Sequence, residues 1–218
     1  MEATLRTVFG NLHLLVEGIQ TTVTLAVLIV VIGTALGLAI GVGLLYAPAP
    51  VRLLLRAYVD ILRGTPLLVL MFLLFYGLPA AGMDIDNFWA VVVALSLFAG
   101  AHVGEIVRGA VSAVPRGQSD AAKAIGLTFW PRIRYVILPQ ALPAALPPWT
   151  NTAIEMVKGT SLAYLLSVPD LLFETQNVVN RTGVPMPFYL TAALIYLAIN
   201  LLLSRLGLWL ERRTRFAT

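Results

Sequence analysis

The stretch VPRGQSDAAKAIGLTFWPRIRYVILP (residues 114–139) is the longest interval of this chain without a strongly apolar run. Four cations, Arg116, Lys123, Arg132 and Arg134, lie within it, and long hydrophobic segments flank it on both sides. A polar, basic helix–turn–helix pattern between two membrane spans is typical of an element that docks on a partner. We therefore interpret residues 114–139 as a cytoplasmic docking element and the flanking segments as the membrane part that it moves.

The composition predicts an all-α integral membrane protein. Apolar residues make up 59% of the 218 residues and charged residues 12%, whereas a soluble domain carries about 25% charged residues. The length accommodates roughly five or six spans of about 20 residues each. The absence of cysteine excludes disulfides and thiol chemistry. The two histidines, His13 and His102, are too far apart in sequence to suggest a metal site, so none is predicted.

Hydrophobic runs predict five spans in a single transmembrane domain covering residues 1–218. The spans are placed at about 19–46, 61–80, 88–108, 137–166 and 187–210, with a coupling loop at 114–136. The first span carries a face of small residues that lets another helix approach closely, namely Gly33, Gly37, Gly41 and Gly43. The segment 47–56, with two prolines, is expected to be a loop, and Gly64 and Pro66 are expected to bend the start of the second span.

Basic residues of the short loops predict the orientation. One side holds Arg52, Arg56, Arg63, the cations from Arg108 to Arg134, Arg212, Arg213 and Arg215, and the other holds Arg6 and Arg181 with Asp84, Asp86, Asp170 and Glu174. Because Lys and Arg concentrate on the cytoplasmic side, we expect a multi-pass protein with its N-terminus outside and its C-terminus in the cytoplasm. The same asymmetry accounts for the net charge of +4 without any nucleic acid partner.

The central stretch has local signals for two helices joined by a tight turn. Residues 120–125 are good helix formers, and Gly126 stands where a helix ends in a left-handed residue. Pro131 suits the first turn of a second helix, which would climb back into the membrane through 135–139. Ala121 and Ala122 would give the short helix a low-profile face for a groove on a partner. Composition alone would favour an ordinary cytoplasmic loop.

This stretch resembles the EAA loop of permease subunits from binding-protein-dependent ABC importers, E-A-A-x3-G-x9-I-x-L-P. The residues in register are Asp120, Ala121, Ala122, Gly126, Leu138 and Pro139, with Asp120 in place of glutamate and Val136 in place of isoleucine. Further segments resemble the polar amino acid branch of that family, the histidine-, glutamine- and arginine-type permeases. They are RGTP (63–66), EIVRGA (105–110), VPRGQ (114–118), ILPQALPAALPPWTN (137–151) and KGTSLA (158–163).

The resemblance implies the five-span fold of type I ABC importers and transport by alternating access across a bacterial cytoplasmic (inner) membrane. A coupling helix would sit in a cleft of a separate ATPase, with contacts from Gln118, Asp120, Ala121, Ala122, Lys123 and Gly126. The chain would have no catalytic residue and no cofactor of its own, because ATP and Mg bind the partner, and it lacks a G-x-x-x-x-G-K-[ST] phosphate loop. Implied partners are the ATP-binding cassette subunit, a second permease subunit (identical or homologous), an extracytoplasmic solute-binding protein, a polar amino acid and the lipid bilayer.

Polar residues inside a span cost a few kcal/mol for a central charge and are therefore candidate sites. The richest cluster, our candidate substrate site, comprises Asn151, Glu155, Lys158, Thr160 and Ser161. Glu155 and Lys158 are three residues apart and face one side of a helix, where they form either an internal ion pair or a site for a zwitterion. Residues 159–161 are expected to interrupt the helix and free backbone groups for a ligand.

Four further residues form a possible gate at the cytoplasmic side: Arg63, Thr65, Glu105 and Arg108. Glu105 and Arg108 are spaced to pair within one helix. Beyond the fourth span, Ser167 is expected to cap a short outer helix, with Asp170 three residues further on and exposed to solvent.

Two other functional classes were weighed. A stand-alone secondary carrier would use Glu155 as a proton or sodium site, but such carriers usually contain an internal repeat of their spans, and the sequence has no second copy of any motif. A membrane enzyme would need a catalytic or metal-spaced constellation, which the sequence lacks. The importer subunit is therefore the leading interpretation.

Overall fold

The computed structural model describes residues 10–214, and every regular element in that range is a helix. In chain order they are α2 (Leu12–Tyr46), α3 (Ala49–Gly64), α4 (Leu67–Ala80), α5 (Asn87–Ala113), α6 (Arg116–Ala124), α7 (Phe129–Arg132), the π-helical turn η1 (Ile133–Ile137), α8 (Leu138–Gly159), the 3₁₀ segment η2 (Thr160–Leu166), α9 (Leu171–Thr182) and α10 (Pro185–Thr214). Arg6 and Arg215, used above for orientation, lie outside the described residues.

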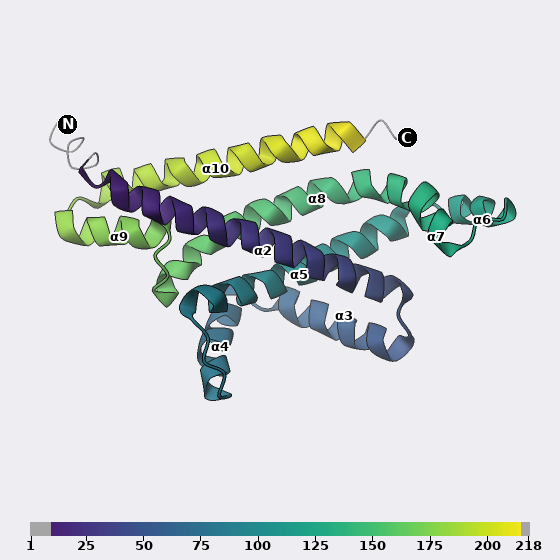
Figure 1. The fold of residues 1–218 in the computed structure, drawn as a ribbon, viewed down its shortest axis with the longest axis horizontal. Coiled ribbons are helices and arrows are strands. Elements are labelled where there is room, and N and C mark those ends of the chain that lie inside the picture. Colours follow the sequence, from purple (N-terminus) through teal and green to yellow (C-terminus); the bar gives the residue numbers. More distant parts are fainter. Residues whose placement is uncertain (1–9, 215–218) are drawn as a thin grey trace.

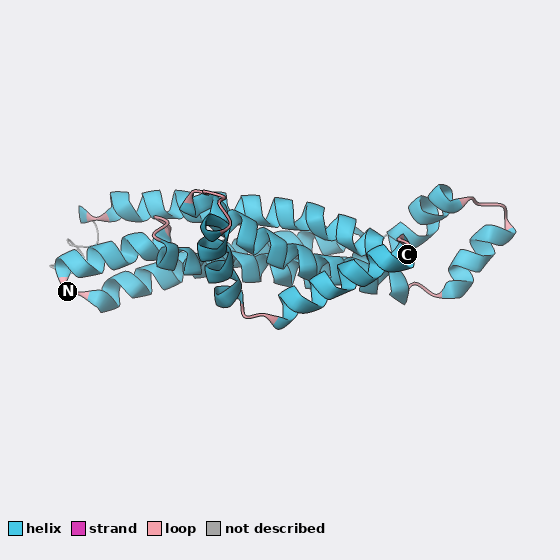
Figure 2. Cartoon of the chain, turned by 90° about the horizontal axis from the view of Figure 1, so that it is seen from below, coloured by secondary structure: helices cyan, strands magenta, loops and turns pink. Residues whose placement is uncertain are grey.

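The molecule is elongated, with α2, α5, α8 and α10 running along its length (Figure 1). The start of α2 and the helix α9 lie at one end, which we call the α9 end. The helices α6 and α7 project at the opposite end, which we call the α6 end and which α10 approaches with its C-terminus (Figure 1, Figure 2). A ligand that crosses the molecule along its helices would therefore pass between these two ends.

The most extensive helix contact joins α2 to α5 through small residues. Gly33, Gly37 and Gly41 of α2 lie against α5, as their spacing predicted, whereas Gly43 lies against Leu55 of α3. A Cβ placed on Gly41 would be 2.6 Å from the Cβ of Val107 and 2.9 Å from the carbonyl oxygen of Gly104. The two backbones can approach this closely only because α2 presents glycine.

Substitution of Gly41 by Ala is expected to lower the thermal stability of the protein in detergent. The new methyl group meets a backbone oxygen that cannot rotate away, and overpacking of this kind costs about 1–3 kcal/mol. Gly77→Ala in α4 is the matched control, because a Cβ there meets nothing within 4 Å and removing a helical glycine is neutral or mildly favourable. Equal melting temperatures for the two variants would contradict the close packing of α2 on α5.

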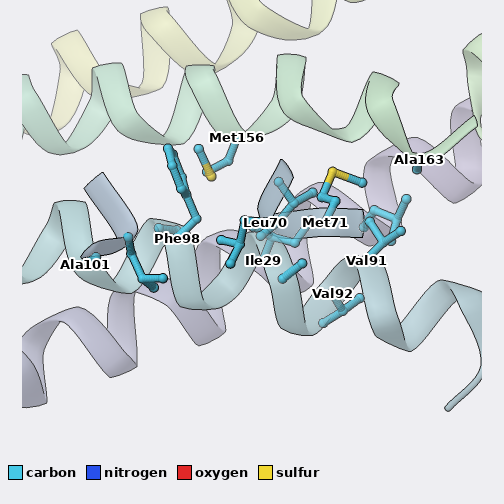
Figure 3. Close-up of a cluster of buried hydrophobic side chains, with 14 of the residues drawn as sticks. Ile29, Leu70, Met71, Val91, Val92, Phe98, Ala101, Met156 and Ala163 are labelled. Carbon is cyan, nitrogen blue, oxygen red and sulfur yellow. The ribbon is translucent and has the colours of Figure 1, made fainter. Parts of the chain in front are cut away.

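The hydrophobic core fills the space between α2, α4, α5 and α8 (Figure 3). Its central side chains include Ile29, Leu70, Met71, Val91, Phe98 and Met156. A smaller cluster of Leu15, Leu171 and Ala192 joins α2, α9 and α10 near the α9 end. The core therefore holds one side of α8 against the rest of the bundle and leaves its other side uncovered.

The prediction of a loop at 47–56 is wrong, because α3 begins at Ala49. Pro48 is its N-cap and Pro50 lies in its first turn, a position that proline favours because its missing amide proton would be unpaired there anyway. The bend expected near Gly64 and Pro66 is confirmed, since α3 and α4 meet at 110°. Thr65 is extended between them, as the residue before a proline prefers.

Within residues 10–214, three helices are long and apolar enough to cross a membrane: α2, α5 and α10. The bent pair of α3 and α4 qualifies as a fourth if it is counted as one broken span. The fourth predicted span is occupied by α8 and η2. Three prolines, Pro143, Pro147 and Pro148, and several polar residues make α8 less apolar than the other long helices. The polar side chains of α8 make it the candidate location of the functional site.

Candidate functional site

One face of α8 is polar and uncovered. Asn151, Glu155 and Lys158 follow each other at intervals of four and three residues, so they lie on the same side of the helix, and all three are exposed. The opposite side of the same turns, with Ala153, Met156 and Val157, is buried in the core. The helix thus places two opposite charges and an amide on a single surface.

Glu155 and Lys158 do not pair with each other. In the part of the chain that the structure describes, the ion pairs are those of Glu105 with Arg56 and with Arg108, and that of Asp120 with Lys123. The internal ion pair considered from the sequence is therefore not formed. Both charged groups remain free to meet a ligand or a partner.

Thr160 and Ser161 are less exposed than Asn151, Glu155 and Lys158, and their hydroxyls bond to the backbone. Thr160 is fully buried and its hydroxyl donates to the Val157 carbonyl oxygen at 2.7 Å, while the hydroxyl of Ser161 donates to that of Lys158 at 2.7 Å. The α-helix ends at Gly159 as expected, but the chain continues as a 3₁₀ helix with right-handed dihedral angles, so this segment is not an open break in the helix. The two hydroxyls satisfy backbone carbonyls at this change of helix type.

The possible gate residues surround Glu105 of α5. The Glu105 carboxylate accepts hydrogen bonds from Nε of Arg108 at 2.9 Å and from Nη1 of Arg56 at 3.2 Å. Thr65 lies apart, since its hydroxyl donates to the carbonyl oxygen of Ile61. Arg56 was missed as a site residue because it pairs across 49 positions of sequence and because residues 47–56 were expected to form a loop. In the helix that the structure has there, its seven-residue spacing from Arg63 places the two arginines on one face.

The central stretch forms the predicted helix–turn–helix. α6 ends after Ala124, Gly126 takes a left-handed conformation with φ of 84°, and its amide donates to the carbonyl oxygen of Lys123 at 2.9 Å. Asp120 and Lys123 form the predicted surface pair at 3.0 Å. Ala122 is buried whereas Ala121 is exposed, so only Ala121 supplies the expected low-profile face. The hairpin projects beyond the helical bundle (Figure 2).

A buried carboxylate lies where α9 begins. Asp170, and not Ser167, is the N-cap: its carboxylate accepts from the amide of Phe173 at 2.8 Å and from the hydroxyl of Tyr196 at 3.1 Å. The expectation that Asp170 is solvated is wrong, since it is fully buried where α2 and α10 cover it. Burial raises the pKa of Asp170 to about 6. Ser167 takes a left-handed conformation instead.

The described residues contain no group of three or more His, Asp or Glu side chains arranged to hold a metal ion. The chemistry that the arrangement supports is recognition of charge. An uncovered polar face on α8 can hold a small polar ligand by ion pairs and hydrogen bonds, and the arginines near Glu105 can attract an anion.

Comparisons with known proteins agree on one family. Residues 33–216 match the family described as binding-protein-dependent transport system inner membrane component. The glutamine transport system permease protein of Escherichia coli is 34% identical over 210 residues, which cover 95% of this chain and 96% of that protein. The L-cystine transport system permease protein of Bacillus subtilis is 38% identical over 197 residues, covering 90% and 84%.

A solved structure of an amino acid ABC transporter with histidines is similar in sequence and fold. Its chain is 36% identical, with a TM-score of 0.85 over 92% of this chain and 94% of that one. The similarity therefore extends over nearly the whole molecule, including α8 and the α6 hairpin.

Proposed function

The chain belongs to the family of binding-protein-dependent transport system inner membrane components, and on that premise we propose how its described residues carry out transport. It is the membrane-spanning subunit of an ATP-driven importer of amino acids, as its relatives are. As a member of that family it works with an ATPase and a substrate-binding partner. The alternative of a stand-alone ion-coupled carrier is not supported by these relatives.

The observation that carries the proposal is the uncovered polar face of α8. A charged side chain that faces lipid at the centre of a bilayer costs a few kcal/mol, so intramembrane charges face water-filled paths or protein. Asn151, Glu155 and Lys158 are exposed in a single copy of the chain and have no ion-pair partner within residues 10–214. This face therefore lines the translocation path, closed on its far side by a second permease subunit.

The charges on this face suit a zwitterion. Glu155 receives the ammonium group of the amino acid and Lys158 its carboxylate, while Asn151 supplies an amide one turn away. Ser161 lies next to Lys158 on η2 and is half-buried. Thr160 faces the core, so its part in the site is limited to shaping the change from α8 to η2.

The α6 hairpin is the site at which the ATPase docks. It projects from the bundle, carries the surface pair of Asp120 and Lys123, and leaves Ala121 exposed. The α6 end then lies in the cytoplasm together with the C-terminus, and the α9 end faces the extracytoplasmic binding protein. This orientation agrees with the arginines near the α6 end. ATP and Mg bind the partner, and this chain holds no cofactor.

Uptake into proteoliposomes tests the proposal. The chain, its ATPase and its binding protein are reconstituted, and uptake of labelled glutamine, histidine and arginine is followed with ATP or with a proton or sodium gradient. We expect uptake only when ATP and the ATPase are both present. Transport by this chain alone down an ion gradient would contradict the proposal and make Glu155 an ion site.

A further inference from the structure

A cavity of about 380 Å³ lies beside the Glu105 cluster and is separate from the polar face around Glu155. Its lining residues come from three helices: Arg63 lies in the last turn of α3, His102, Glu105 and Gly109 belong to α5, and Ala144 and Pro148 to α8. Apart from the first three of these, the lining residues are small or apolar. The cavity is thus roomy enough for an amino acid and is polar at only a few positions.

The charges around this cavity are not balanced. The Glu105 carboxylate is held by both Arg56 and Arg108, so one negative group is shared between two positive ones. Arg63 adds a third guanidinium, which is exposed and forms no ion pair within the described residues. Asp60, on the same face of α3 between Arg56 and Arg63, is a second anion nearby. Three cations against two anions leave a net positive charge beside the cavity. Such a site favours an anion.

The histidine in the cavity wall adds a polar atom without adding a fixed charge. Nδ1 of His102 lies 3.0 Å from the carbonyl oxygen of Phe98, and the imidazole ring packs on the Phe98 ring with centroids 4.4 Å apart. The hydrogen bond fixes the ring and leaves Nε2 as its other polar atom. His102 therefore offers a positioned hydrogen-bonding group beside Arg63.

The cavity lies on the same side of α8 as the polar face, but nearer the α6 end. Ala144, Pro148, Asn151 and Glu155 follow at intervals of four, three and four residues, so they lie along one side of the helix. Pro148 lies seven residues before Glu155, or about 10 Å along the helix axis. A molecule released from Glu155 towards the α6 end would meet this cavity next.

We propose that the cavity is a second station on the transport path, which binds the carboxylate of the amino acid through Arg63 after the amino acid leaves Glu155. The inference rests on the proposed function for the identity of its ligand, whereas the preference for an anion rests on the charges alone. Arg56 and Arg108 hold Glu105 so that it does not repel the carboxylate. Arg63 is the residue that contacts the ligand.

The absence of cysteine in this chain allows a clean test by labelling a single introduced thiol. Gly109→Cys places a thiol in the cavity wall, where a Cβ meets nothing within 4 Å. The importer complex in nanodiscs is treated with an anionic, sulfonate-bearing or a cationic, trimethylammonium-bearing methanethiosulfonate, and labelling of this chain is followed by intact mass. Each rate is divided by that of free cysteine with the same reagent.

We expect the normalised rate to favour the anionic reagent by about ten-fold, and Arg63→Gln to remove most of that preference. Arg52→Gln is the matched control, an exposed arginine eleven residues earlier on the same side of α3, and it should keep the preference. L-Glutamine or L-histidine should slow labelling unless Arg63 is replaced, whereas their α-carboxamides should not.

Several results would overturn the second station. Two of them concern the reagents: equal normalised rates for the anionic and the cationic reagent, or a preference for the anionic reagent that survives Arg63→Gln. The others concern protection from labelling: equal protection by an amino acid and its carboxamide, protection by phosphate alone, or no protection by either amino acid. Failure of the proposed function is a different result, because it appears as absent ATP-driven uptake by the unsubstituted complex. Failure of the second station leaves that uptake intact.

Discussion

Glu155→Gln is expected to abolish ATP-driven amino acid uptake while the permease still assembles with its ATPase. Glu155 is exposed on the polar face of α8 and has no ion-pair partner in the described chain, so its charge is available to the substrate ammonium group. Loss of one partner of a desolvated charge pair costs about 2–5 kcal/mol, which lowers binding by about 30-fold or more. The measurement is uptake into proteoliposomes, with assembly followed by size-exclusion chromatography.

Glu17→Gln is the matched control for this prediction, because Glu17 is an exposed glutamate of α2 near the α9 end, away from the face of α8. It should transport at the wild-type rate. Unchanged uptake by Glu155→Gln would show that Glu155 does not recognise the substrate. Loss of assembly in Glu155→Gln would instead give the residue a structural role, which its exposure does not suggest.

Ala121→Arg is expected to uncouple the permease from its ATPase. Ala121 is an exposed small residue of α6, and under the proposed docking a long charged side chain there would not fit between α6 and the ATPase. Overpacking costs about 1–3 kcal/mol, which corresponds to a loss of affinity of about 5- to 150-fold. Ala121→Ser keeps the low profile at the same position and should retain the ATPase. The measurement is the amount of ATPase bound per permease after purification in detergent.

An undiminished complex with Ala121→Arg would mean that the ATPase contacts another part of the α6 end. Because Ala121 is exposed and Ala122 is buried, the same substitution at Ala122 would disturb the hairpin itself. A substitution at Ala121 therefore tests docking of the ATPase without disturbing the fold of the hairpin.

The α6 hairpin was predictable because its shape follows from the residues of the hairpin itself. A helix-forming run that ends in a glycine needs only the chain itself to turn at Gly126, and the structure has φ of 84° there. The glycine face of α2 was predictable for a similar reason, since small residues at helical spacing have little use except close packing. Long apolar runs likewise located the principal helices, because the length of such a run is a local property of the sequence.

The features that the sequence did not predict depend on tertiary contacts or on the position of a proline within a helix. Pro48 and Pro50 suggested a loop, but proline at a helix start is as favourable as in a turn. The pairing of Arg56 with Glu105 joins two helices, and the burial of Asp170 requires α2 and α10 to cover the start of α9. No local pattern reports which helices become neighbours.

The candidate site was partly predictable. Helical periodicity correctly placed Glu155 and Lys158 on one face, because that geometry is independent of the rest of the fold, and the structure adds Asn151 to this face. It could not show whether Glu155 and Lys158 pair, since side-chain rotamers and the surrounding space determine that. It also could not show that Thr160 faces the core, because α8 changes to a 3₁₀ helix at that residue.

Co-purification in detergent tests the central claim most directly, namely that this chain is moved by a separate ATPase through α6. The intact chain and a variant lacking Ser119 to Gly126 are each purified with the candidate ATPase. The ATPase is expected to accompany the intact chain and to be lost with the deletion. Retention of the ATPase by the deletion variant, with unchanged ATP-driven uptake, would contradict the account.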